Sequence, residues 1–290
     1  MVTITPTVHR GPYAAIDPAH PEHSQAGRTI LVTGGSKGIG FAIARAFAQA
    51  GASRIIVVAR SPTALKQCVP RIQAEVPDFQ GQLLPLEGDL GDPASIEALC
   101  CRLNKESIAV DVLVLNGART QEESSMLNLG WEQTWKLLET NVRGNFMLVA
   151  KLMSYSTSPP KAILNVSSPF VHDREMAAGF RPYAVSKSTL TWALEHLAEE
   201  VPAEQTQIVS FHPGFIFTEG MKEAGCTTDD MDWDDENLPG NFAVWAASPK
   251  AAFLHGRFAW AKWDVEELSE RFPDEVQRDS NFLRIGVRGI

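Results

Sequence analysis

The segment YAVSK at residues 183–187 places a phenol and an ammonium group four positions apart. The surrounding sequence RPYAVSKSTLTWALEHLAEE is predicted to be helical, and side chains at this spacing share one face of a helix. A free tyrosine has a pKa of about 10, and a neighbouring cation lowers it by stabilising the phenolate. The pair therefore predicts a general acid, Tyr183, made effective at neutral pH by Lys187. The structural alternative is that Tyr183 packs and Lys187 faces solvent.

The elements that must position this pair recur along the chain. Short apolar runs predict strands at 29–33, 54–59, 82–90, 111–118, 161–168 and 206–214. Amphipathic stretches between them predict helices at 41–51, 61–76, 92–106, 131–153 and 182–200, with Gly51 as a stop, Pro70 as a potential bend and Asp92 as an N-cap. Continuously apolar strands alternating with helices indicate a parallel sheet covered on both faces. The expected fold is a single α/β domain, doubly wound and Rossmann-type, with ligands at the carboxyl ends of the strands.

Composition and charge exclude several classes of protein. Hydrophobic residues make up 44% of the 290 residues, enough for a packed core. The formal net charge of −9 argues against nucleic-acid binding, which needs a basic face. No apolar run approaches the roughly 20 residues of a membrane helix, and the N-terminus lacks a signal pattern. Four cysteines without metal-binding spacing indicate free thiols and no metal site. A soluble cytoplasmic protein is expected.

Three regions are expected along the chain. Residues 1–27, rich in proline and polar residues, predict an irregular N-terminal arm. Residues 28–263 predict a dinucleotide-binding catalytic domain, and residues 264–290 a C-terminal helix and tail.

A glycine-rich turn, TGGSKGIG at 33–40, follows the first predicted strand and opens the first helix. Gly34, Gly38 and Gly40 would let the backbone approach a pyrophosphate, which the helix N-terminus stabilises. The spacing is GxxxGxG, so a glycine turn without a ligand is the alternative. An NAD-binding chain carries a carboxylate about 20 residues beyond the glycines. Arg60 stands there instead, and Lys37 lies in the turn, which favours the 2′-phosphate of NADP; a solvated strand end is the alternative for Arg60.

These motifs, in this order, closely resemble the short-chain dehydrogenase/reductase family of the classical type. The matching segments are TGGSKGIG, GDL (88–90), NGA (116–118), NVRG (141–144), NVSS (165–168), YAVSK and HPGFIFT (212–218). The C-terminal part from GNFAVWAASPK onward resembles fungal members, many of which act on specialised metabolites. NGA stands where the family more often has NAG, and the 15 positions from Ser168 to Tyr183 are slightly more than is commonest there.

The resemblance implies a role for each matching residue. Tyr183 would be the acid in reduction and the base in oxidation, and Lys187 would bind the nicotinamide ribose and lower the pKa of Tyr183. Ser168 would hold the substrate oxygen, with Ser167 as the alternative, and Asn141 would hold a water in a proton relay to Lys187. The implied cofactor contacts are Gly34, Ser36, Lys37, Gly38, Ile39, Gly40, Arg60, Asp89, Leu90, Asn116, Gly117, Tyr183, Lys187, Pro213, Gly214, Ile216 and Thr218.

Other candidates carry weaker expectations. His212 is expected to be structural, and His172, Asp173 and Arg174 to lie in a solvated loop or to meet substrate. The acidic run DDMDWDDE at 229–236 does not match a calcium loop and predicts a mobile lid at about 219–240, whose Met231 and Trp233 could fold over an apolar substrate. Trp131 and Trp135 are expected to pack or to form an interface.

The resemblance implies an NADP-dependent oxidoreductase acting on a small-molecule ketone or secondary alcohol, and a homodimer or homotetramer joined through helices 131–153 and 182–200. The first alternative is a non-redox isomerase, epimerase or cyclase on the same fold. A second is a cofactor-sensing regulator, which would not need Tyr183.

Overall fold

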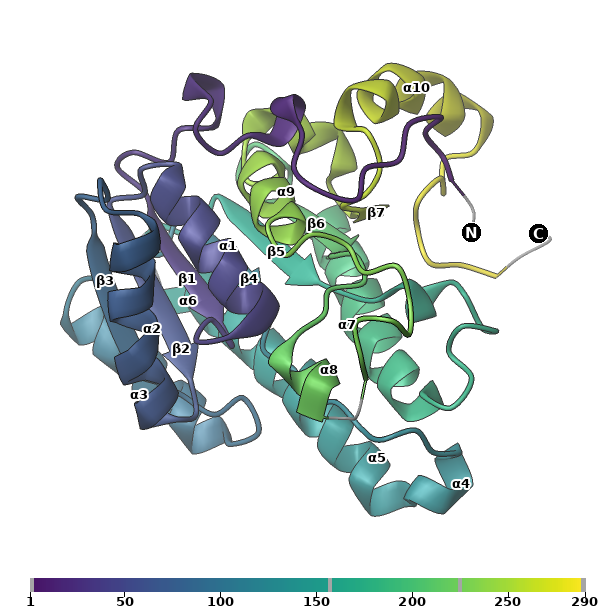
Figure 1. Ribbon diagram of the computed structural model, residues 1–290, viewed down its shortest axis with the longest axis horizontal. Helices are drawn as coiled ribbons and strands as arrows, with labels where there is room; N and C mark the ends of the chain where they lie inside the picture. The colour runs from purple at the N-terminus through teal and green to yellow at the C-terminus, as the bar shows by residue number, and fades with distance from the viewer. Residues whose placement is uncertain (1–2, 156–157, 224–225, 288–290) are drawn as a thin grey trace.

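One sheet of seven parallel strands forms the centre of the molecule, in the order β3-β2-β1-β4-β5-β6-β7 (Figure 1). The computed structural model describes residues 3–155, 158–223 and 226–287. The strands are β1 Thr29–Thr33, β2 Arg54–Ala59, β3 Gln82–Glu87, β4 Val112–Leu115, β5 Ala162–Val166, β6 Gln207–His212 and β7 Arg257–Trp260. The order reverses direction between β1 and β4, which makes the carboxyl ends of these strands the expected ligand site.

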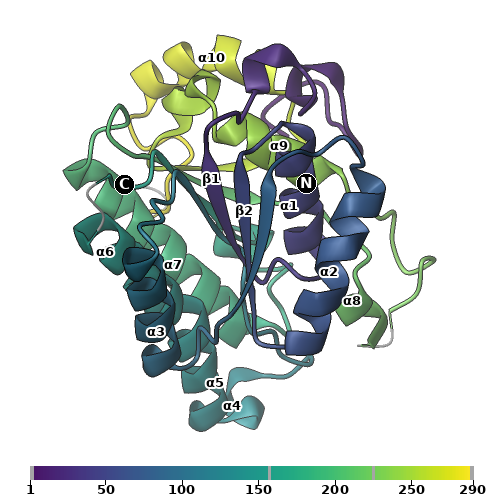
Figure 2. The ribbon, with the colours of Figure 1, turned by 90° about the vertical axis from the view of Figure 1, so that its left-hand side faces the viewer.

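Helices cover both faces of the sheet, as Figure 2 shows, and each face has its own apolar core. One core includes side chains of α1 (Gly38–Gln49), α2 (Pro62–Glu75), α9 (Leu238–Ala246) and α10 (Val265–Arg278). The other includes side chains of α3 (Pro93–Lys105), α6 (Asn145–Tyr155) and α7 (Arg181–Glu200). Shorter helices are α4 (Met126–Leu129), α5 (Trp131–Leu138) and α8 (Glu219–Glu223). The predicted doubly wound, single-domain fold is confirmed.

Local sequence rules explain several element boundaries. Strands β1 and β2 have the predicted bounds, and their residues are almost wholly buried because helices cover both sides. Asp92 caps α3 as predicted, since its Oδ1 accepts a hydrogen bond of 2.9 Å from Ala94 N–H. Gly51 has a φ of +75° just beyond α1, the left-handed conformation that favours glycine after a helix. Helix α2 continues through Pro70.

The predicted helix 131–153 differs from the observed one. It consists of α5, a π-helical turn at Glu139–Gly144, and α6. Gly144 lies in this turn, where an added Cβ would come within 2.0 Å of Leu90 O, so the wide turn lets the chain pass close to the segment after β3. The interruption thus positions Asn141, which lies inside it.

The N-terminal arm contacts the segment just after β7, and the C-terminal tail contacts β7 itself, an edge strand that is nevertheless buried. The N-terminal arm, residues 3–27, contains one-turn 3₁₀-helices at Ala14–Ile16 and Pro21–His23 and is otherwise irregular. Val8 forms an antiparallel bridge with Trp263, while Phe258 in β7 donates its N–H to Leu283 O in the C-terminal tail. Across the ranges that the structure describes, no helix has the length and apolar character needed to cross a membrane.

Candidate active site

The glycine turn between β1 and α1 is shaped by close contacts that only glycine permits. Gly34 has a φ of +63°, and a Cβ there would lie 2.9 Å from Asn116 Nδ2. A Cβ on Gly40 would lie 2.3 Å from Gly34 O, which is impossible without a backbone shift. Lys37 precedes the first turn of α1 without giving it a side-chain cap. The turn therefore leaves the start of α1 at the carboxyl edge of the sheet, the arrangement that a pyrophosphate site needs.

The NGA turn after β4 is hydrogen-bonded to the end of β1. Asn116 Nδ2 donates hydrogen bonds to Thr33 O and Gly34 O at 2.9 and 3.2 Å. Thr33 Oγ1 accepts from the backbone N–H groups of Asn116 and Gly117. These bonds hold the two turns together at the point where the strand order reverses, so Asn116 and Gly117 lie where the sequence predicted cofactor contacts.

Charged residues follow the next two strands at the same edge of the sheet. Arg60, directly after β2, and Lys37 are exposed, and neither side chain makes a hydrogen bond or ion pair with any residue that the structure describes. Asp89, after β3, accepts a hydrogen bond from Gly91 N–H at 2.8 Å. The remaining predicted contacts near the glycine turn are Ser36, which is buried, Gly38 and Ile39 in the first turn of α1, and Leu90 beside Asp89.

The two serines that follow β5 have different surroundings. Ser167 Oγ forms a buried hydrogen bond of 2.8 Å with Thr191 Oγ1 of α7. Thr191 Oγ1 also accepts from Asn165 Nδ2, so Ser167 belongs to a network inside the fold. Ser168 Oγ accepts only a long bond of 3.4 Å from Phe170 N–H and keeps its own proton to donate. Between the two alternatives, the structure therefore favours Ser168 as the residue that meets a substrate oxygen.

Tyr183 and Lys187 lie on one face of α7, as the spacing predicted. Lys187 Nζ is 5.7 Å from the centroid of the Tyr183 ring and donates a hydrogen bond of 2.8 Å to Val166 O at the end of β5. Gln121, in the loop after β4, accepts a bond of 3.0 Å from Tyr183 N–H and so fixes the start of the helix. The pair is thus anchored to β5 and to the loop after β4.

The structure does not show the predicted lowering of the Tyr183 pKa by Lys187. Burial raises the pKa of Tyr183, although part of the residue remains accessible to solvent. Burial likewise lowers the pKa of Lys187 to about 8, because desolvation disfavours the charged form of either group. The Lys187 ammonium is directed at Val166 O, and desolvation is the cause of both pKa shifts.

Asn141 is buried in the π-helical turn and connects three segments. Its Nδ2 donates hydrogen bonds of 2.9 Å to Arg119 O and to Ser186 Oγ, and its Oδ1 accepts from Arg119 N–H at 2.7 Å. Ser186 Oγ in turn donates to Tyr183 O. Asn141 therefore fixes the loop after β4 to the helix that carries Tyr183. Its expected role in a water relay stays a prediction.

The histidines near the site have structural contacts. His212, at the end of β6, packs edge-to-face on Trp260, with ring centroids 4.6 Å apart, and burial lowers its pKa to about 3. A histidine that stays neutral here agrees with the structural role expected for it. His172 accepts a hydrogen bond of 3.0 Å from Trp260 Nε1. Asp173 Oδ1 accepts from two backbone N–H groups of its own turn, and Arg174 is exposed.

The loop after β6 returns to the glycine turn. Pro213 is buried, Gly214 has a φ of +99°, and Ile216 forms a parallel bridge with Asp234. A Cβ on Gly38 would lie 3.4 Å from Thr218 Cγ2, so Thr218 rests against the glycine turn. All the predicted contacts of this loop therefore lie at the carboxyl edge of the sheet.

The structure places the end of the predicted lid, 219–240, inside the fold, and residues 224–225 of that segment lie outside the described residues. Leu238, Pro239 and Gly240 are buried in α9, and Asp234 is also buried, so the end of the predicted segment belongs to the core. Met231 is exposed, and Trp233 packs on Phe217 with ring centroids 5.2 Å apart. Closure of the segment before Asp234 over a substrate stays a prediction. No group of three or more metal-binding side chains is found within the described residues.

Several residues that shape the site were not predicted. Thr33 and Gln121 make the hydrogen bonds that join loops from different strands, and Phe170 packs edge-to-face on Tyr183, with ring centroids 6.2 Å apart. Thr33 ends β1, while Gln121 and Phe170 lie in the segments after β4 and β5, and these positions could have indicated a role because the carboxyl ends of parallel strands meet at one edge.

Comparisons with known proteins agree with this geometry. The family model described as short chain dehydrogenase matches residues 28–228. The chain is 35% identical over 284 residues to short chain dehydrogenase/reductase AacuD of Aspergillus aculeatus, covering 98% of this chain and 96% of that protein. The chain belongs to the short-chain dehydrogenase/reductase family.

Other short-chain dehydrogenase/reductases support the same assignment. A member from Claviceps purpurea is 34% identical over 286 residues, covering 98% of this chain and 94% of that protein. These fungal relatives confirm the predicted resemblance to fungal members. The solved structure of the Pseudomonas aeruginosa RhlG/NADP active-site complex superposes with a TM-score of 0.73 at 24% identity, covering 83% of this chain and 97% of that chain. This likeness confirms the fold.

Proposed function

We propose that this short-chain dehydrogenase/reductase transfers a hydride between NADPH and a ketone or secondary alcohol of a specialised metabolite. The observation that carries the proposal is the position of Lys187. Its Nζ bonds Val166 O, two residues before Ser168, and lies 5.7 Å from the ring centroid of Tyr183. The three side chains that the family resemblance assigns to carbonyl chemistry therefore lie on two elements in direct contact.

The chain's own residues have distinct roles in this reaction. Ser168 donates a hydrogen bond to the substrate oxygen, where negative charge develops. Tyr183 gives its proton to that oxygen during reduction and accepts it during oxidation. Lys187, whose ammonium lies beside the Tyr183 ring, favours the phenolate that remains after the transfer. Bound NADPH supplies the hydride.

The choice of NADP over NAD is supported by two exposed cations. Arg60 follows β2, where an NAD-binding chain carries a carboxylate, and Lys37 belongs to the glycine turn. A guanidinium can bind a phosphate through two hydrogen bonds, and an ammonium adds a point charge. The described residues offer neither side chain another partner, so both are free to meet a 2′-phosphate. The Pseudomonas aeruginosa RhlG structure, which shares the fold, is a complex with NADP.

A homodimer or homotetramer is part of the proposal. Trp131 and Trp135 on α5 are 74% and 58% exposed, and Trp192 on α7 is 55% exposed. Exposing several tryptophan side chains on neighbouring helices to water is unfavourable in free energy, and such a group is typical of a protein–protein interface. We infer that α5 and α7 pack against a second copy of the chain.

The proposal is tested by the oxidation of NADPH with a panel of polycyclic and polyketide-like ketones. Tyr183→Phe should lower turnover by about 10² or more, the scale of general acid catalysis. Binding of NADPH to Tyr183→Phe, measured by its fluorescence, should stay close to that of the wild type and serves as the control for folding. Ketone reduction by Tyr183→Phe at the wild-type rate would show that the assigned mechanism is wrong. Conversion of a substrate without net oxidation of NADPH would instead identify the isomerase alternative.

A further inference from the structure

A buried carboxylate outside the catalytic residues is held by donors from three distant segments. The side chain of Asp234 is 0% exposed. Its Oδ1 is 3.0 Å from Lys262 Nζ and 3.3 Å from Arg10 Nε, and its Oδ2 accepts a hydrogen bond of 2.8 Å from Phe215 N–H. Asp234 has no part in the proposed roles of Tyr183 or the glycine turn, and as a buried carboxylate it has to be paired with a cation or hydrogen-bonded.

Asp234 binds the loop after β6 through both its backbone and its side chain. Its own N–H donates a bond of 2.8 Å to Phe215 O, while its carboxylate accepts from Phe215 N–H. Ile216 pairs with Asp234 in a parallel bridge, and a Cβ on Gly214 would lie only 3.0 Å from Asp234 Oδ2. The segment from Gly214 to Ile216, which holds two of the expected cofactor contacts, therefore takes its position from Asp234.

The N-terminal arm supplies one of the two cations and places the other. Arg10 reaches Asp234 through its guanidinium, and Arg10 also donates to Trp233 O at 3.0 Å. The Arg10 carbonyl accepts from Asp235 N–H at 2.7 Å. His9 N–H donates to Lys262 O at 2.7 Å, which fixes the backbone of the second cation.

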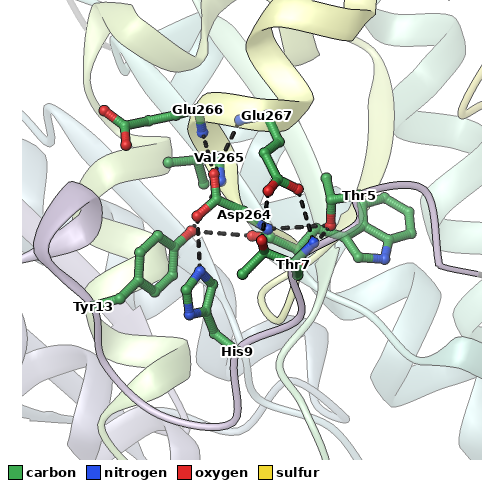
Figure 3. A network of polar contacts seen from close by, with 9 residues as sticks. Thr5, Thr7, His9, Tyr13, Asp264, Val265, Glu266 and Glu267 are labelled. Carbon is green, nitrogen blue, oxygen red and sulfur yellow. Dashed lines mark hydrogen bonds and ion pairs between the residues drawn. The ribbon is translucent and has the colours of Figure 1, made fainter.

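The arm is itself anchored to the N-terminal end of α10, as Figure 3 shows. His9 Nε2 lies 2.8 Å from Asp264 Oδ2, and Thr7 N–H donates to Glu267 Oε2 at 2.9 Å. Tyr13 Oη accepts from Val265 N–H and lies 3.0 Å from Trp263 O. These contacts hold Arg10 in place independently of the acidic segment that it meets.

We propose that Arg10 of the N-terminal arm is a positioning residue for the loop after β6, and acts on cofactor binding through Asp234. The inference rests on the proposed function in one respect only, namely that this loop contacts the cofactor. In the absence of the Arg10 guanidinium, Asp234 keeps one cation, and its hold on Phe215 N–H weakens. Loosening of Gly214–Ile216 then lowers the affinity for the cofactor without touching a catalytic side chain.

The test compares Arg10→Met with Arg271→Met, a matched control. Arg271 binds Ile4 O of the same arm but makes no contact with Asp234. In the free protein, hydrogen exchange of the segment containing Phe215 should become about tenfold faster in Arg10→Met and stay unchanged in Arg271→Met. The Kd for NADPH, measured by fluorescence without substrate, should rise about tenfold in Arg10→Met alone. Arg10→Lys, which restores a cation, should recover both values in large part.

Each outcome separates the inference from the proposed function. Wild-type protection of Phe215 in folded Arg10→Met would overturn the inference, and so would an equal loss of protection in Arg271→Met. If the wild type fails to bind NADPH, the proposed function fails, while the exchange measurement still tests the link from Arg10 to Phe215. If Arg10→Met does not fold, Arg10→Gln replaces it, because glutamine keeps a donor for Trp233 O but lacks the charge. Wild-type protection of Phe215 in Arg10→Gln would then overturn the inference.

Discussion

Replacing each of the two serines at the end of β5 by alanine should separate catalysis from stability. Ser168→Ala removes the hydroxyl that is free to donate to a substrate oxygen. Ser167→Ala removes the partner of Thr191 Oγ1, at 2.8 Å in a buried network. The two changes are chemically identical and adjacent in the chain, so each serves as the control for the other.

The expected magnitudes differ in kind. Loss of one donor to a developing oxyanion costs about 10²–10³ in kcat, or about 2.7–4 kcal/mol. We expect that loss for Ser168→Ala, with little change in Tm, because Ser168 Oγ accepts only a bond of 3.4 Å. Loss of the buried bond in Ser167→Ala should lower the free energy of unfolding by about 1 kcal/mol, or more if Thr191 is left poorly satisfied. Turnover of this variant should stay within about threefold of the wild type.

The assay measures kcat and KM for one ketone at saturating NADPH, together with the midpoint of thermal unfolding for the same preparations. Near-normal turnover in Ser168→Ala together with a large loss in Ser167→Ala would refute the assignment drawn from the hydrogen bonds. Large losses in both would show that the network around Ser167 positions the catalytic serine.

Three further predictions concern the cofactor, pH and assembly. Arg60→Asp should lower the ratio of kcat/KM for NADPH to that for NADH by about 10-fold or more, because a charged hydrogen bond is lost and a repulsion is added. An unchanged ratio would count against the NADP proposal. Burial raises the pKa of Glu195 from 4.5 to about 8, so the native state holds a proton that the unfolded chain releases, and stability should fall as pH rises through this window. Glu195→Gln should flatten that decline in chemical unfolding measured from pH 5 to 8, whereas Glu199→Gln, an exposed control, should not. Trp192→Glu should shift the oligomer toward the monomer in light scattering, and an unchanged mass would contradict the proposed interface.

The sequence predicted most of the sheet because local patterns and tertiary environment agree there. The run TILVT is buried on all sides, and its apolar character, its flanking glycines and its length all favour the strand that is observed. The glycine turn could be predicted for a similar reason, since Gly34 and Gly40 have no substitute at such short contact distances.

Other features depended on contacts between distant residues. Strand β7 has only four residues, and its sequence RFAW gives no periodicity by which to recognise it. The choice between Ser167 and Ser168 required knowing that Thr191 faces the first of them. The acidic segment looked uniformly solvated because charge density dominates its composition, yet Asp234 is buried by Arg10 and Lys262 from elsewhere in the chain. No local pattern shows such a pairing in advance.

Because the N-terminal arm is anchored to α10, it can form its native contacts only late in folding. Thr7 and Glu267 are 260 positions apart in the chain, and His9 and Asp264 are 255 apart. During synthesis from the N-terminus, strands β1 to β6 can pair while the partners of the arm do not yet exist. The arm therefore cannot form these contacts before α10 has been synthesised. Contacts of such long sequence separation also form late because loop closure must come first. The arm, although it is synthesised before the sheet, is thus among the last segments to reach its native position.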